Sequence, residues 1–226
     1  MVMKMDLILI LFIIIVPLMA DIKVKMNYNT YSKQKNSLNM TGKEVARKIL
    51  DNNGLNYVDI LQTKGSLTDH YNPLTKKIFL SENTYGSKSI AAAAVAAHEV
   101  GHAIQDKESY SYLRFRNKMV PFVNFTSRAA TILIFISFIF NFMEMFDAGI
   151  VLLLVGLLFQ LITLPVEFNA SNRAKEQLKS CGLLEKNDIS GTKSMLNTAA
   201  FTYVASFLAM ALQILRLILI RNSNNN

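Results

Sequence analysis

Two histidines separated by three residues are the feature of this sequence that most directly indicates chemistry. His98 and His102 flank Glu99 in the pentapeptide HEVGH, an HExxH motif. On an α-helix, residues four apart share a face with Cβ atoms about 5–6 Å apart, so both imidazoles can bind one ion. Glu99 is offset by one residue and can reach a metal-bound water without ligating the metal. The motif therefore predicts a hydrolytic zinc site with Glu99 as the catalytic general base.

The motif lies in the segment with the clearest helical pattern. Ser89 is a suitable N-cap for the alanine-rich run that continues through the motif, and alanine has the highest helix propensity. Residues 41–53 predict a shorter amphipathic helix that begins with a capping box and ends at Gly54. Residues 57–61 and 77–80 have β-like patterns, and Gly and Pro residues between them indicate turns.

A catalytic zinc needs a third protein ligand in addition to the histidine pair. The remaining candidates are His70, Asp106, Glu108, Glu167 and Glu176. Glu167 is favoured because it would begin a helix at the end of an apolar stretch, on the same side of a membrane as the motif. On such a helix Glu167, Ala170, Ser171 and Ala174 would share one face. The residues alone leave the other candidates open.

Long apolar stretches indicate a membrane protein. Hydrophobic residues make up 51% of the 226 residues and charged residues only 18%, which excludes a disordered chain. The apolar stretches are 7–20, 129–146, 148–166 and 199–220. The last three have about the 17–25 residues that a bilayer-spanning helix needs. The first is shorter, and we interpret it as an uncleaved anchor in preference to a signal peptide.

The distribution of positive charge predicts the orientation in the membrane. The net charge is +8, and 16 of the 24 Lys and Arg residues lie in 21–128, with five more in 167–198. Cytoplasmic loops are enriched in Lys and Arg, so both segments should face the cytoplasm, in a bacterial plasma membrane. The turn near Asp147 and both termini should lie outside. Topology accounts for the basic excess, and no nucleic-acid-binding motif accompanies it.

These patterns predict a mainly α-helical, multi-pass membrane protein with a zincin-like α+β cytoplasmic insert. The predicted parts are a transmembrane anchor helix (1–22), the insert with the HExxH helix (23–128), a transmembrane hairpin (129–166), a cytoplasmic helix carrying the third ligand (167–198), and a transmembrane helix with the tail (199–226). The single cysteine, Cys181, excludes a disulfide framework and a cysteine-based zinc cluster.

Four segments resemble the YugP-like family of membrane-bound neutral zinc metallopeptidases. They are TGKEVARKILDNNGL (41–55), LTDHYNPLTKKIFLSE (67–82), SIAAAAVAAHEVGHAIQ (89–105) and LPVEFNASNRA (164–174). The family is also similar to HtpX-type membrane proteases, in which an Asp follows the ligand Glu by four residues. This chain has Ser171 at that place.

The resemblance implies an integral-membrane zinc metalloendopeptidase that hydrolyses peptide bonds with a zinc-activated water. It implies one Zn²⁺ per chain held by His98, His102 and Glu167, with Glu99 as the general base. Its substrate would be a peptide or protein, membrane proteins included, and its site would lie at the cytoplasmic membrane surface. The alternatives are a catalytically silent zinc-binding scaffold or adaptor and, less favoured because few charges lie within the spans, a transporter.

Two further expectations concern substrate binding. The extended segment 67–82 could offer a strand edge that pairs with the substrate backbone, as a strand beside the metal helix commonly does in such peptidases. His70, Tyr71 and Arg173 are candidates for stabilising the oxyanion. A local structural role is at least as well supported for each of the three.

Overall fold

The computed structural model describes residues 2–183 and 185–223, and the described chain is mainly helical. It divides into two compact units. One, called here the apolar-helix unit, comprises Met1–Asp21, Arg114–Pro165 and Thr202–Asn226; the other, called the site unit, comprises Ile22–Leu113 and Val166–Phe201. The HExxH motif and Glu167 therefore belong to the same unit.

The site unit contains a small sheet and the two predicted helices. Its elements are α2 (Gly42–Asn52), β1 (Asp59–Thr63), β2 (His70–Asn72), β3 (Lys77–Ser81), α3 (Glu82–Tyr85) and α4 (Ile90–Lys107). The strand order is β1-β3-β2, with β3 parallel to β1 and antiparallel to β2. The mixed three-stranded sheet and the predominance of helix confirm the predicted fold class.

The ends of these elements follow local sequence signals. The capping box of α2 is present: the Glu44 backbone N–H donates to Thr41 Oγ1 at 3.2 Å, and Glu44 Oε2 accepts from the Thr41 N–H at 2.7 Å. Ser89 caps α4 by accepting from the Ala92 N–H. Strand β1 begins later than the predicted 57–61 because the Val58 N–H donates to the Leu55 carbonyl in a turn.

The core of the site unit forms around α4. Its alanines at 91–94, 96 and 97 are almost fully buried. All of them except Ala92 belong to one core cluster with Ile49 and Leu50 of α2, Ile78 and Leu80 of β3, and Leu178. Small side chains let neighbouring elements approach this helix closely. The apolar surface that α2 and β3 bury against α4 stabilises the unit, because burial stabilises roughly in proportion to apolar area.

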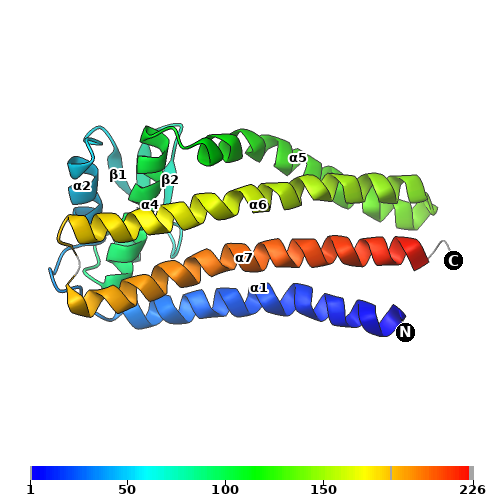
Figure 1. Ribbon diagram of the computed structural model, residues 1–226, viewed down its shortest axis with the longest axis horizontal. Helices are drawn as coiled ribbons and strands as arrows, with labels where there is room; N and C mark the ends of the chain where they lie inside the picture. Colours follow the sequence, from blue (N-terminus) through cyan, green and yellow to red (C-terminus); the bar gives the residue numbers. More distant parts are fainter. Residues whose placement is uncertain (1, 184, 224–226) are drawn as a thin grey trace. The chain divides into compact units, whose positions relative to one another are not determined.

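Four long helices contain the apolar stretches. They are α1 (Val2–Ser32), α5 (Ser111–Phe140), α6 (Met143–Ser180) and α7 (Lys186–Ser223). All four are long and apolar enough to cross a membrane. Within the apolar-helix unit, α1 lies beside α7, and α5 lies beside α6 (Figure 1). Ion pairs between Asp6 and Arg216, at 2.6 Å, and between Asp147 and Arg221, at 2.8 Å, connect α7 to α1 and to α6.

Several predicted boundaries of the long helices are wrong. The predicted helix 167–198 is not continuous, because α6 ends at Ser180, and α7 begins at Lys186 and not near 199. Glu167 does not begin a helix, because α6 continues through it from Met143 to Ser180 with Pro165 inside. Proline removes one backbone donor, which an otherwise strongly helical stretch can tolerate.

The turn between the second and third apolar stretches lies at 141–142 and not near Asp147. The chain turns there because Asn141 adopts a left-handed conformation, with φ 55°. Asparagine tolerates this conformation better than most residues do.

Candidate metal centre

Two histidines of α4 and one carboxylate of α6 come together in the site unit. Glu167 Oε2 lies 3.3 Å from His98 Nε2 and 3.5 Å from His102 Nε2. Two ligands bound to zinc at about 2.0–2.1 Å in a tetrahedral arrangement are separated by about 3.3–3.4 Å. The donor set of two imidazole nitrogens and one carboxylate oxygen also suits zinc. Both the spacing and the chemistry of these residues therefore fit the metal.

The close approach of α4 and α6 depends on Gly101, inside the motif. A Cβ at this position would lie 2.6 Å from the Ala170 carbonyl oxygen and 3.2 Å from the Ala170 Cα. Both atoms are backbone, so they cannot move aside as a flexible side chain would. Any side chain at position 101 would push α6 away and move Glu167 away from the histidines. On the α6 side, Val166, Ala170 and Ala174 are fully buried, as expected for a face packed at helical spacing.

A buried glutamine orients His102. Gln105, fully buried one turn further along α4, places its Oε1 3.0 Å from His102 Nδ1. Its Nε2 donates to the Val166 carbonyl at 2.8 Å and to Asn169 Oδ1 at 2.9 Å. With the amide nitrogen so engaged, Oε1 must act as an acceptor and Nδ1 as a donor. This leaves the Nε2 lone pair of His102 facing Glu167 and available to a metal.

A hydroxyl contacts His98, the other histidine of the motif. Ser171 Oγ lies 3.3 Å from His98 Nδ1, and Ser171 is buried. This is the residue four positions after Glu167, where HtpX-type proteases have a carboxylate. Ser171 contacts the Nδ1 atom of His98. Unlike a carboxylate, its hydroxyl carries no negative charge. It can fix the orientation of His98 but raises the basicity of the imidazole less than a carboxylate would.

Glu99 is buried beside the three candidate ligands. Its side chain is only 7% exposed, and burial raises the pKa of its carboxyl. The imidazoles of His98 and His102 oppose this shift, whereas the carboxylates of Glu167 and Asp69 add to it. A carboxyl with a raised pKa takes up a proton more readily than an exposed one. For His102, burial lowers the pKa, but the Glu167 carboxylate outweighs burial and raises it.

The other candidate ligands lie elsewhere. His98, His102 and Glu167 form the only potential metal-binding group among the described residues. His70 is exposed and stacks on Phe79. Asp106 accepts a hydrogen bond from Tyr71 and pairs with Lys76, Glu108 pairs with Arg173, and Glu176 is exposed.

The oxyanion candidates are engaged in local contacts. The Tyr71 hydroxyl donates to Asp106 Oδ2 at 2.6 Å, and burial together with this carboxylate raises the pKa of Tyr71 well above its ordinary value. Arg173 donates to Glu108 at 2.6 Å and to Asn169 at 2.7 Å. Asn169 in turn accepts a hydrogen bond from Gln105, which contacts His102. The contacts of Arg173 therefore help to position His102 indirectly.

Comparison with known proteins identifies the family. A family model described as "putative neutral zinc metallopeptidase" matches residues 6–222, which is nearly the whole chain. The chain belongs to this family. It is also 45% identical over 201 residues to the "putative membrane protease YugP" of Bacillus subtilis (strain 168), an alignment that covers 89% of each protein. No solved structure matches the chain.

Membership in the neutral zinc metallopeptidase family agrees with the site and the helices. The chain is a zinc metallopeptidase and a homologue of a membrane protease, with four candidate membrane-spanning helices. The resemblance drawn from the four sequence segments is thereby confirmed.

Proposed function

We propose that this chain is an integral-membrane zinc metalloendopeptidase. In this proposal His98, His102 and Glu167 hold one Zn²⁺ per chain, and Glu99 is the catalytic base. The observation that carries it is the pair of Nε2–Oε2 distances, 3.3 and 3.5 Å, which agree with the spacing of zinc ligands. The amide oxygen of Gln105 that accepts from His102 and the Ser171 hydroxyl at His98 support it, because ligand histidines usually have their second ring nitrogen hydrogen-bonded.

The proposed division of labour follows from the positions of the side chains. When bound, zinc lowers the pKa of water toward about 7 and polarises a carbonyl. Glu99 takes the proton of the attacking water and delivers it to the amine that leaves when the peptide bond breaks. Burial raises the pKa of Glu99, which favours uptake of the proton from water.

The sheet offers a place for the substrate backbone. Strand β2 is at one edge of the sheet, paired on one side with β3. An extended peptide can add to such an edge through main-chain hydrogen bonds, which requires no particular side-chain sequence. We therefore propose peptides and proteins as substrates, membrane proteins among them.

Metal removal tests the proposed activity. Full-length protein purified in detergent should contain about one zinc per chain by elemental analysis. It should cleave an unfolded protein substrate, lose this activity on treatment with a chelator, and regain it when zinc is restored. Protein that keeps its zinc but never cleaves peptides would contradict the proposal and favour the silent scaffold.

The single cysteine offers a test of the proposed cytoplasmic orientation. Cys181 is half-buried and follows the α6 segment that carries Glu167. A membrane-impermeant maleimide should label it only after the cells are permeabilised. A matched variant combining Cys181→Ala with Ser223→Cys, at the exposed end of α7, should be labelled in intact cells. The reverse labelling pattern would place the site outside the cytoplasm.

A further inference from the structure

A cavity whose lining includes none of the candidate metal ligands lies in the site unit. It has a volume of about 260 Å³ and is lined by Lys175, Lys179, Ile189, Thr192 and Lys193. Drug-sized ligands occupy cavities of about 300–1,000 Å³, so this one suits a smaller group. Its walls come from the end of α6 and the first turns of α7.

Three of the five residues that line the cavity are lysines. Among the described residues, none of its three lysines forms an ion pair with an acidic side chain. Lys175 is half-buried, and its ammonium donates to the Asn197 side-chain oxygen at 2.8 Å. Burial lowers the pKa of Lys175, and the nearby charge of Lys193 lowers it further. An anion in the cavity would relieve both effects.

One residue that borders the cavity has a buried hydroxyl. Thr192 is 1% exposed, and its Oγ1 has no hydrogen-bond partner in the described chain. Helical Ser and Thr hydroxyls commonly donate to the carbonyl four residues earlier. In α7, Thr198 and Ser206 do so, at 2.7 and 3.0 Å. The Thr192 hydroxyl differs from them, and leaving a buried polar group unpaired is costly unless a ligand completes it.

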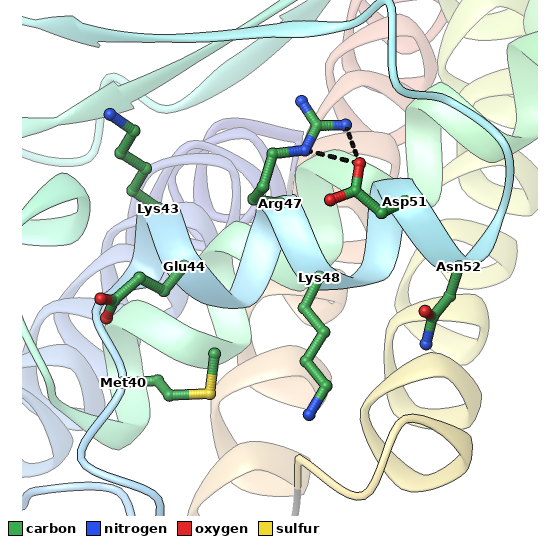
Figure 2. Close-up of a pocket in the computed structure, with 7 residues that line it drawn as sticks. All are labelled: Met40, Lys43, Glu44, Arg47, Lys48, Asp51 and Asn52. Atoms are coloured by element: carbon green, nitrogen blue, oxygen red, sulfur yellow. Dashed lines mark hydrogen bonds and ion pairs between the residues drawn. The ribbon is translucent and has the colours of Figure 1, made fainter.

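The hollow along α2 differs from this cavity. It is lined by residues between Met40 and Asn52. Figure 2 shows Arg47 turned toward Asp51, and the Arg47 guanidinium also donates to the carbonyls of Leu55 and Val58. Lys43 lies over the Tyr85 ring. These cations already have partners inside the fold, whereas the lysines between α6 and α7 have no anionic one.

We propose that the cavity formed by Lys175, Lys179, Thr192 and Lys193 binds the phosphate of an anionic phospholipid headgroup. A phosphate accepts several charge-assisted hydrogen bonds, which ammonium and hydroxyl donors supply. A lipid source is favoured by the sequence, because Lys193 precedes the apolar stretch 199–220 by six residues and Lys175 follows the apolar stretch 148–166 by nine. Basic pockets close to membrane-spanning helices are typical headgroup sites.

Lipid binding to the full-length, delipidated protein in detergent tests this site. Native mass spectrometry would measure the Kd for phosphatidylglycerol, with phosphatidylcholine as the uncharged comparison. We expect a Lys175→Gln/Lys193→Gln variant to raise the Kd for phosphatidylglycerol by about tenfold or more, since each change removes a charged donor. The Thr192→Val variant, which keeps the side-chain shape, should raise it severalfold.

Matched controls separate a built site from general charge attraction. A Lys23→Gln/Lys118→Gln variant removes the same charge at exposed positions near other apolar stretches and should bind phosphatidylglycerol as the wild type does. Zinc content and circular dichroism should be unchanged in every variant, so failure of this proposal is distinguishable from failure of the metal site. Thr192→Val and the single Lys193→Gln change keep the test decisive if the Lys175→Gln/Lys193→Gln variant does not fold.

Other outcomes would overturn the proposal. Equal loss of binding in the control and cavity variants would mean non-specific attraction. Competition by millimolar inorganic phosphate that fully displaces the lipid would assign the site to free phosphate. Selective binding of an acidic peptide, without preference for phosphatidylglycerol over phosphatidylcholine, would assign it to a protein segment.

Discussion

Replacing Glu99 with glutamine should lower the rate of peptide hydrolysis by about 10²–10⁴-fold, the usual contribution of a general base, while zinc stays bound. Glutamine has nearly the same shape as glutamate but cannot take up the proton of the attacking water. Because Glu99 is not among the three candidate ligands, the variant should keep the zinc content of the wild type. The measurements are kcat and KM with an unfolded protein substrate, and zinc by elemental analysis.

The control for this variant is Glu176→Gln, which makes the same chemical change at an exposed position of α6. It should cleave the substrate at the wild-type rate. Full activity in the Glu99→Gln variant would exclude Glu99 as the base. A Glu99→Gln variant that binds zinc and fully complements a deletion strain, despite having no peptidase activity, would favour the scaffold alternative. Comparing the membrane proteins that accumulate in this strain and in the wild type would also indicate the substrates.

The local part of the candidate site could be predicted from the sequence. The spacing of His98 and His102 is a property of one helix, and the Ser89 cap and the alanine run specify that helix without reference to the rest of the chain. The shared burial of Glu167, Ala170, Ser171 and Ala174 was likewise predictable, since helical periodicity determines which residues face the same way.

The tertiary contacts of the site were harder to predict from the sequence. Which side chain meets the histidine pair depends on how α4 and α6 pack, and spacing left five candidates, four of them carboxylates. The close approach of the two helices at Gly101 brings Glu167 to the pair. The Gln105–Asn169 contact was missed altogether. Its signal was present, since Gln105 follows His102 by three residues and so shares its face, but a glutamine alone does not indicate which partner it will meet.

Element boundaries failed for a related reason. The end of an apolar stretch marks where a helix leaves apolar surroundings. The helix itself need not end at that residue. Residues after Val166 retain helical periodicity, so α6 continues and carries Glu167 in its interior. This continuity matters for the site, because the side chain of an interior helical residue is directed by both flanking turns. Glu167 is therefore held more rigidly than it would be at a helix terminus, where chain ends fray.

Replacing Glu167 with glutamine should raise the Kd for zinc by more than about 100-fold, because loss of a ligand should exceed the 10- to 100-fold effect of losing an outer-shell partner. Glutamine keeps the volume of this fully buried side chain, so the packing of α6 on α4 should survive. The negative charge that faces both Nε2 atoms is lost. Competition with a zinc indicator of known affinity measures the change.

The matched control for this change is Glu108→Gln. Glu108 is a carboxylate that the sequence also allowed as the third ligand, and the structure instead pairs it with Arg173 at 2.6 Å. This variant should lose at most a small part of its zinc affinity, through the weaker support of Asn169 and Gln105. If Glu108→Gln lost zinc and Glu167→Gln retained it, the metal would have to be held by another set of residues. The distances of 3.3 and 3.5 Å around Glu167 would then reflect an ion pair between histidine and glutamate alone.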